Sequence, residues 1–377
     1  MERLSAKNLK SEDSMDLNDL LMDVVQAAIE DLGHVNVIIA GRSGVGKSTL
    51  INAIFQGDFA KVGQGKPVTP NIQEITKEGI PLTIFDTRGL EMNEFSSTLE
   101  KVEILVSERC RNTDPNKHIH LAWICIQEDL RRVEEAEIML QDMLAKYVPI
   151  ITIITKARSD NGFKNEVAKL LPKSKNIVRV RAISEIFDEG YKLPTMGLKD
   201  LVQASLEVIP EGKKRAFCAV QKADIDSKIE QSHKIVATAA TTAATAALSP
   251  LPMTDSVALA MIQVGMIANI SSVFGMNLSL STLSTIISSA IGVTGAGFAG
   301  RAIVASVFKF FPGIGTATGV AIAASTASAI TVALGEAYIS VLASIYLNNP
   351  GTVPEARDIA QKFKEKLLTG RELKDSD

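Results

Sequence analysis

Short apolar runs recur through residues 33–210 and alternate with stretches of helical periodicity. The runs cover residues 35–40, 82–85, 121–126 and 148–154. Runs of this length with few polar residues are typical of strands buried on both faces of a parallel sheet. Each run is followed by a loop and then a helical stretch, so the pattern predicts a doubly wound α/β domain.

An apolar stripe with helical spacing precedes the first of these runs. It predicts an amphipathic helix and is formed by Leu17, Leu20, Leu21, Val24, Val25, Ala28 and Leu32. Two interpretations are open. The favoured one is a helix packed on the α/β domain, since amphipathic helices usually face their own core; the other is contact with a partner or a membrane. The residues before the stripe are charged, so no signal peptide is expected.

The pattern changes again near residue 210. Residues 197–208 predict a last amphipathic helix, and Pro210, Glu211 and Gly212 mark a boundary after it. Residues 213–234 then predict a charged linking helix. We therefore expect an N-terminal segment at 1–32, an α/β domain at 33–210, a link at 211–234 and an all-α, hydrophobic, small-residue-rich domain at 235–377.

The last of these segments is poor in charge. Between residues 235 and 354 the charged residues are Asp255, Arg301, Lys309 and Glu336. The uncharged runs 256–300 and 310–335 are longer than the roughly 20 residues that span a bilayer. A water-soluble bundle with small-residue seams is one interpretation. Membrane association through residues 235–350 is the favoured one, because four charges cannot cover the surface of a soluble domain.

Charge and cysteine content narrow the classes of function. The formal net charge is −3, which argues against a general nucleic-acid binder. Three cysteines give no disulfide framework and favour a reducing, cytoplasmic compartment, with membrane association as the addition to it. His118 and His120 alternate on a predicted strand and have no third ligand nearby in sequence, so structural roles are favoured over a shared metal.

One motif carries specific chemistry. Residues 41–48 read GRSGVGKS, follow an apolar run and open a predicted helix, which is the context that the G-x-x-x-x-G-K-[ST] pattern requires. Backbone N–H groups of such a loop surround a β-phosphate, with glycines allowing the close approach. Lys47 supplies a cation to the β- and γ-phosphates, and the Ser48 hydroxyl is placed to bind Mg²⁺.

Two further segments extend this site. Asp86 and Gly89 form a D-x-x-G motif directly after a predicted strand, where the Asp supports Mg²⁺ and the Gly N–H contacts the γ-phosphate. Thr69 lies in a Gly- and Pro-rich loop between the two motifs. Its order in the sequence favours a switch threonine that binds Mg²⁺ when γ-phosphate is present, over a plain turn.

The base-reading loop is less regular. Thr155 and Lys156 follow the fourth apolar run and fit the start of a guanine-specifying loop, in which a carboxylate two residues after the Lys accepts from the base. That position holds Arg158, and Asp160 stands two residues further on. Asp160 is the predicted substitute, and the Ala182 backbone N–H is predicted to meet the base oxygen.

The segments GRSGVGKSTLINAIF, GKPVT, FDTRGLE, HLAWICI and ITKA resemble Era-like, septin-like and immunity-related GTPases of the translation-factor-related class. The segments SPLPMTD and AMIQVGM resemble a hydrophobic helical domain of unknown function that accompanies such GTPases. The resemblance implies a GTP/GDP and Mg²⁺ site and γ-phosphate hydrolysis. It covers most of residues 34–350.

The predicted site draws on residues from several segments of the chain. The nucleotide is predicted to contact Gly41, Ser43, Gly44, Val45, Gly46, Lys47, Ser48, Thr49, Asp86, Gly89, Thr155, Lys156, Asp160 and Ala182. The predicted metal ligands are Ser48, Thr69 and Asp86, and the predicted catalytic residues are Lys47, Thr69 and Gly89.

The residue after Gly89 separates two hypotheses. Ras-type enzymes carry a water-orienting Gln there, whereas this chain carries Leu90. One hypothesis is a slow GTPase switch that acts on a membrane-associated helical domain, with a homo-oligomer or an activating partner supplying the missing group. The other is a non-catalytic, nucleotide-gated scaffold or membrane-remodelling oligomer. An ATPase is a third option, because the base-reading loop is irregular.

Overall fold

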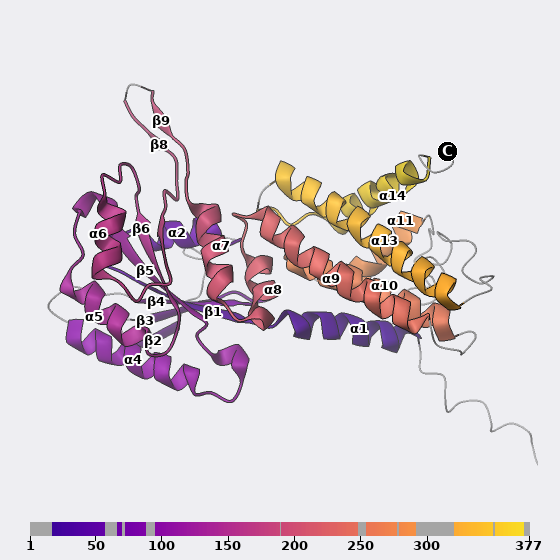
Figure 1. Cartoon of the computed structure of the whole chain (residues 1–377), viewed down its shortest axis with the longest axis horizontal. Helices are drawn as coiled ribbons and strands as arrows, with labels where there is room; N and C mark the ends of the chain where they lie inside the picture. The colour runs from indigo at the N-terminus through magenta and orange to yellow at the C-terminus, as the bar shows by residue number, and fades with distance from the viewer. Residues whose placement is uncertain are drawn as a thin grey trace, which may run out of the picture.

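The computed structural model describes residues 17–56, 66–69, 72–87, 95–188, 190–247, 254–276, 279–291, 320–349 and 351–372. Figure 1 shows two regions side by side: an α/β region built around a sheet, and a bundle of long helices. Gly89 and Leu90 lie outside the described residues, as do Gly65 and Pro70 on either side of the described strand that ends at Thr69.

The sheet has seven strands in the order β2-β3-β4-β1-β5-β6-β7. The five strands from β4 to β7 in this order run parallel, whereas β2 and β3 pair antiparallel at one edge. The strands are β1 Val35–Ala40, β2 Lys66–Thr69, β3 Ile72–Thr76, β4 Leu82–Thr87, β5 Leu121–Gln127, β6 Ile150–Thr155 and β7 Asn176–Arg179. The predicted doubly wound α/β domain is confirmed, with an antiparallel edge that the sequence pattern did not predict.

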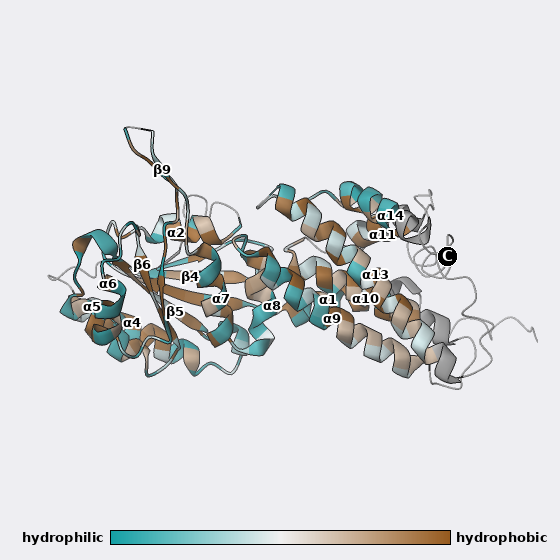
Figure 2. Ribbon diagram, turned by 45° about the horizontal axis from the view of Figure 1, so that its top comes forward, coloured by the Kyte–Doolittle hydropathy of each residue, from teal (hydrophilic) through white to brown (hydrophobic). Residues whose placement is uncertain are grey.

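Helices cover both faces of this sheet, because side chains alternate along the central strand β1. Val37 and Ile39 join the apolar cluster of α2, α7 and α8, whereas Ile38 joins the cluster of α4 and α5 on the other face. Figure 2 shows the hydrophobic strands in brown beneath helices that carry hydrophilic, teal residues. The helices are α2 Lys47–Ile54, α4 Phe95–Cys110, α5 Glu135–Leu144, α6 Phe163–Leu170, α7 Leu198–Val208 and α8 Glu211–Val220.

A two-stranded hairpin leaves this α/β region. It consists of β8 Glu185–Ile186 and β9 Lys192–Leu193, which pair antiparallel, and it projects outward in Figure 1. Two short 3₁₀ helices, Pro115–Lys117 and Glu128–Leu130, flank the strand β5. The hairpin and the second of these helices both contribute to the site described below.

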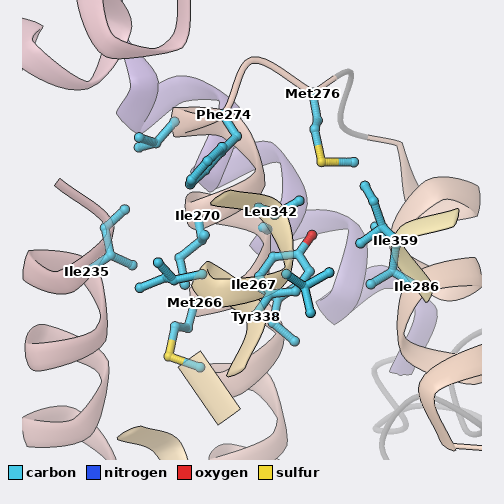
Figure 3. Close-up of a cluster of buried hydrophobic side chains, with 14 of the residues drawn as sticks. Ile235, Met266, Ile267, Ile270, Phe274, Met276, Ile286, Tyr338, Leu342 and Ile359 are labelled. Atoms are coloured by element: carbon cyan, nitrogen blue, oxygen red, sulfur yellow. The ribbon is translucent and has the colours of Figure 1, made fainter. Parts of the chain in front are cut away.

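The helical region consists of α1 Leu17–Leu32, α9 Ile225–Ala246, α10 Thr254–Val273, α11 Leu280–Ile291, α13 Val320–Asn348 and α14 Ala356–Glu372. Its centre is one apolar cluster, shown in Figure 3, in which Ile267, Tyr338 and Ile359 come from three different helices. The all-α prediction for this part of the chain is confirmed for the described residues.

The packing partner of the first helix was predicted wrongly. Val25 and Ala28 of α1 are buried in the cluster of the helical region, and α1 packs chiefly against α10 rather than on the sheet. An apolar stripe specifies that a helix has a buried face, but it does not specify which core that face meets. Both candidate cores are apolar, so the choice depends on contacts far apart in sequence.

The predicted linking helix at 213–234 is also interrupted. The chain forms α8 and then α9, with residues 221–224 between them. Gln221 pairs with Phe55 in an isolated antiparallel bridge, and the Asp224 carboxylate accepts from the Asp226 amide at the start of α9. The bridge to Phe55 comes directly after α8, and the Asp224 cap begins α9, so the charged stretch forms two helices.

One described helix is long and apolar enough to cross a membrane. Residues Ala324–Asn348 of α13 have a mean hydropathy of 1.7 over the most apolar window, of which 56% is buried against the rest of the protein. The core helix of a water-soluble protein has the same properties. The spacing of Gly292 with Ala296 and Gly300, and of Gly315 with Gly319, is typical of closely packed helices, and these residues lie outside the described ones.

Candidate nucleotide-binding site

The loop between β1 and α2 forms an open cradle. A Cβ atom on Gly41 would lie 2.6 Å from the Cys125 carbonyl oxygen of β5, so only glycine allows the loop to sit on that strand. Gly44 and Gly46 have φ values of +74° and +103°, and a Cβ there would meet no described atom within 4 Å. The loop is therefore closed against β5 at Gly41 and open at Gly44 and Gly46.

Lys47 lies across this loop. Its Nζ donates to the Gly41 carbonyl at 2.7 Å and to the Arg42 carbonyl at 3.2 Å, and the residue is only 9% exposed. The Thr155 hydroxyl donates to the Val45 carbonyl at 2.7 Å, which ties the end of β6 to the same loop. The Lys47 ammonium and the end of β6 are thus both tied to carbonyl groups of the loop.

Two side chains with oxygen atoms that could bind a metal ion flank the loop. In the parallel pairing of β1 with β4, Asp86 stands opposite Ile39, so its buried carboxylate lies at the same edge of the sheet as the loop. Ser48 is exposed in the first turn of α2. A hydroxyl and a carboxylate are oxygen ligands of the kind that Mg²⁺ takes. Thr69 ends β2 opposite Ile72, and its side chain is outside the described set.

A pocket of about 190 Å³ continues from the loop. It is lined by Gly46, Thr49, Leu50, Thr155, Lys156, Val180, Arg181, Ala182, Ile183 and Glu185. The structure therefore brings the predicted residues Thr49, Thr155, Lys156 and Ala182 together beside the phosphate loop. Lys156 has a φ of +53°, and its Nζ donates to the Gln127 side-chain oxygen at 3.2 Å.

Asp160 does not line this pocket. Its Oδ1 accepts from the Lys164 amide at 2.9 Å, in the first turn of α6, and lies 3.6 Å from the Arg179 Nε. Arg158, which stands where a guanine-reading carboxylate was expected, donates from Nε to the Glu185 Oε2 at 2.7 Å. The structure thus places a different carboxylate at the pocket.

Glu128 is a functional candidate that the sequence patterns missed. Its carboxylate accepts from the Arg158 and Ser159 amides and from the Arg179 Nε at 2.7 Å. Burial alone would raise its pKa, but these hydrogen bonds and the charge of Arg179 lower it below the ordinary value. Glu128 follows the strand β5 directly, as acidic residues do in many loops, so the sequence offered no distinguishing signal.

His118 and His120 lie before β5 and not on a strand as predicted, and each contacts a backbone carbonyl. The Asn36 amide donates to the His120 Nδ1 at 3.0 Å, so the ring proton is on Nε2, which donates to the Pro115 carbonyl at 3.1 Å. The His118 Nε2 lies 2.6 Å from the Asn112 carbonyl. Within the described part of the chain, no group of three or more His, Cys, Asp or Glu residues could hold a metal ion.

Comparisons with known proteins agree with this geometry. Residues 36–156 match the family described as 50S ribosome-binding GTPase, and residues 220–368 match a domain of unknown function, DUF697. The tRNA modification GTPase MnmE of Cupriavidus pinatubonensis is 30% identical over 148 residues, which is 37% of this chain and 30% of that protein. GTPase Era of Clostridium kluyveri is 27% identical over 186 residues, which is 47% of this chain and 57% of that protein.

A solved structure is also similar, at a lower sequence identity. The crystal structure of Toc33 from Arabidopsis thaliana in complex with Mg²⁺ and GMPPNP covers 52% of this chain and 95% of its own, at 15% identity and a TM-score of 0.33. The chain spans about a third of the length of MnmE and somewhat more than half of Era. Residues 36–156 thus match a P-loop GTPase domain, and residues 220–368 match a helical domain of unknown function.

Proposed function

We propose that this protein binds GTP and GDP through residues 41–48, hydrolyses GTP slowly, and passes its nucleotide state to the helical domain. The observation that supports this most is the cradle itself. Three glycines shape an open loop, and the Lys47 ammonium lies across it on the Gly41 and Arg42 carbonyls. A loop of amide donors with a fixed cation is complementary to a di- or triphosphate.

Mg²⁺ is the metal that this donor set fits. The Ser48 hydroxyl and the Asp86 carboxylate would hold it, with the Thr69 hydroxyl joining when a γ-phosphate is present. When bound, Mg²⁺ neutralises charge on the β- and γ-oxygens. The Gly89 amide is the proposed contact to the γ-phosphate, and it makes the segment after Asp86 sensitive to the nucleotide.

Slow turnover follows from the residue after Gly89. Leu90 is apolar and cannot orient a water molecule, so hydrolysis depends on another group. Arg88, Glu91 and Glu94 are candidates within the chain, and a second copy or an activating partner is the candidate outside it. The rate on purified protein should therefore be low and should rise with a partner or with self-association.

A short structural route supports coupling to the helical domain. Helix α2 begins at Lys47. Just past its end, the backbone amide of Gln56 donates to the Val220 carbonyl at 2.8 Å. The Lys222 amide donates back to the Ile54 carbonyl at 2.8 Å. The phosphate loop and the start of the helical domain are thus joined by one helix of eight residues.

The decisive experiment measures nucleotide binding and turnover in wild type and in Lys47→Ala. We expect calorimetric binding of GDP and GTP by wild type, at least about tenfold weaker GTP binding by the variant, and no single-turnover hydrolysis by it. Lys117→Ala, an exposed lysine in a 3₁₀ helix, is the matched control and should behave as wild type. A wild-type protein that binds neither nucleotide would overturn the proposal.

The second candidate is a nucleotide-gated scaffold without catalysis, which Leu90 favours. It predicts GTP-dependent self-association by light scattering with negligible hydrolysis, and a monomer in every nucleotide state would reject it.

Membrane association, suggested by the apolar helix Ala324–Asn348, is tested by liposome flotation with GDP and with a non-hydrolysable GTP analogue. If the protein stays in the soluble fraction with both nucleotides, membrane association is rejected for both candidate functions.

A further inference from the structure

The pocket beside the phosphate loop needs an acceptor if it is to select guanine. The N1–H and N2–H₂ groups of guanine both donate along one edge, whereas adenine presents a different pattern, so a carboxylate facing that edge discriminates between them. This inference rests on the proposed function, because it concerns the base of the same nucleotide. The residue two after Lys156 is Arg158, a donor, so the carboxylate has to come from elsewhere.

Asp160, the nearest carboxylate in sequence, is committed to other partners. It accepts from the Lys164 amide in the first turn of α6, and its backbone carbonyl accepts from Arg131. It also faces Arg179 at 3.6 Å. These contacts hold Asp160 against α6 and β7, and it is absent from the lining of the base pocket. Bringing it into the pocket would break the contact that supports the start of α6.

Glu185 lies in the lining of this pocket. It is the only carboxylate among the described residues that line the pocket, and it comes three residues after Ala182, at the start of β8. Its side chain is 21% exposed, so it is largely removed from bulk water. The same pocket is lined by Lys156, whose aliphatic stem would lie over a base held there.

Arg158 holds this carboxylate. Its Nε donates to the Glu185 Oε2 at 2.7 Å, and its guanidinium carbon lies 5.9 Å from the centre of the Phe187 ring in the same hairpin. A carboxylate has about four acceptor positions, so the bond from Arg158 leaves positions for a second partner. The backbone amide of Arg158 is in turn held by the buried Glu128.

We propose that Glu185 is the residue that selects guanine, and that Arg158 positions it. Arg158 occupies the place of the expected carboxylate and, by pairing with Glu185, delivers a carboxylate from β8 to the same pocket. The charge at the base edge is then the one that guanine requires, although the loop after β6 carries the opposite charge. Specificity in this chain depends on a pair of residues 27 positions apart.

The test is a change of specificity in Glu185→Gln. A glutamine amide offers one acceptor and one donor, which matches the N1–H and the C2 oxygen of xanthine in place of guanine. We expect GDP binding about 10- to 100-fold weaker than wild type and XDP binding stronger than wild type, both measured by calorimetry. Asp160→Asn is the matched control and should leave the ratio of GDP to XDP affinity unchanged.

Further variants separate the role of Glu185 from damage to the fold. Glu185→Asp should weaken GDP binding without strengthening XDP binding, and Arg158→Gln should weaken GDP binding less than Glu185→Gln does. A gain of XDP affinity requires a folded pocket, so it cannot arise from misfolding. Loss of GDP binding by Glu185→Gln without a gain for XDP would overturn the inference.

Other outcomes are equally distinct. A specificity change in Asp160→Asn but not in Glu185→Gln would return the role to Asp160. Equal affinity of wild type for ADP and GDP would show that neither carboxylate selects the base, and would overturn this inference while leaving nucleotide binding intact. Failure of wild type to bind any nucleotide would instead reject the proposed function.

Discussion

Single buried polar residues hold the loops of this protein together. His120 is one of them: burial lowers its pKa to about 4, and its Nδ1 accepts from the Asn36 amide. Because the Nδ1 acceptor exists only in the neutral ring, protonation would break a bond that joins β1 to the segment before β5. The residue is therefore a source of acid sensitivity in the α/β domain.

The first prediction concerns this acid sensitivity. Between pH 6.5 and 4 the unfolded chain takes up a proton at His120 that the folded chain does not, so the free energy of unfolding falls as pH falls through this window. The loss should be about 2 kcal/mol between pH 6.5 and 5. His120→Asn keeps an acceptor but does not titrate. Urea denaturation should give it a flatter pH dependence than wild type, and identical slopes would contradict the assignment.

A second prediction at this scale concerns Glu128. Glu128→Gln removes the charge that holds Arg179 and weakens the bonds to the Arg158 and Ser159 amides, all at a side chain that is 2% exposed. We expect a loss of about 2–3 kcal/mol in the free energy of unfolding, together with weaker GDP binding. The neighbouring Asp129→Asn, whose carboxylate is 39% exposed, is the control and should change stability by less than about 0.5 kcal/mol. Equal effects of the two variants would show that burial of Glu128 does not matter.

At the scale of elements, small residues set how closely the long helices approach. Helices α9 and α13 cross at Gly335, where a Cβ atom would lie 2.5 Å from the Val236 Cγ2 and 3.0 Å from the Met266 Sδ. Val236 is β-branched and buried in a helix, so its side chain has little freedom to move away. The glycine is kept in mid-helix, where its intrinsic propensity is poor, because of this contact.

The third prediction follows from that contact. Gly335→Ala should lower the free energy of unfolding by about 1–3 kcal/mol, since overpacking outweighs the gain in helix propensity. Gly212→Ala in α8 is the matched control, because a Cβ there meets no described atom within 4 Å. It should be neutral or stabilising by up to about 1 kcal/mol. Thermal unfolding monitored by circular dichroism compares the two, and a stabilised Gly335→Ala would show that the helices can separate without cost.

At the scale of the whole molecule, the two domains meet where α2 ends. Lys228 of α9 is completely buried there, and its Nζ donates to the Cys218 carbonyl, to the Ala219 carbonyl at 3.2 Å and to the Val273 carbonyl at 3.1 Å. One ammonium group thus joins α8, α9 and α10 beside the segment that pairs with Gln56. Burial lowers its pKa to about 7, which reflects the cost of holding a cation at this point.

The fourth prediction uses this junction. In wild type, GDP binding should slow hydrogen exchange of backbone amides in α9 and α10 as well as in the phosphate loop. Lys228→Met should retain GDP binding but lose the effect on the two helices. Lys234→Met, an exposed lysine two turns along α9, is the matched control and should keep it. Protection that stays confined to the α/β domain in wild type would refute coupling through this junction.

Local patterns were sufficient for much of the fold. The phosphate loop, the strands β1 and β5 and the helix α7 follow from residues adjacent in sequence, because strand burial, glycine geometry and helical periodicity are local properties. The edge strand β2, its neighbour β3 and the opposite edge strand β7 were not predicted. Each has four or five residues and is only partly apolar or disturbed by proline, so its pairing is set by neighbours in space.

The sequence by itself determined that a cradle of amides and one lysine exists, since eight consecutive residues build it. Tertiary structure decided which core α1 joins, where the linking helix breaks, and which carboxylate lines the pocket beside the loop 41–48. Those outcomes depend on pairs such as Arg158 with Glu185 or Phe55 with Gln221, which lie far apart along the chain. No local pattern encodes them, because the energy of each contact exists only after the sheet and the helices have brought its two partners together.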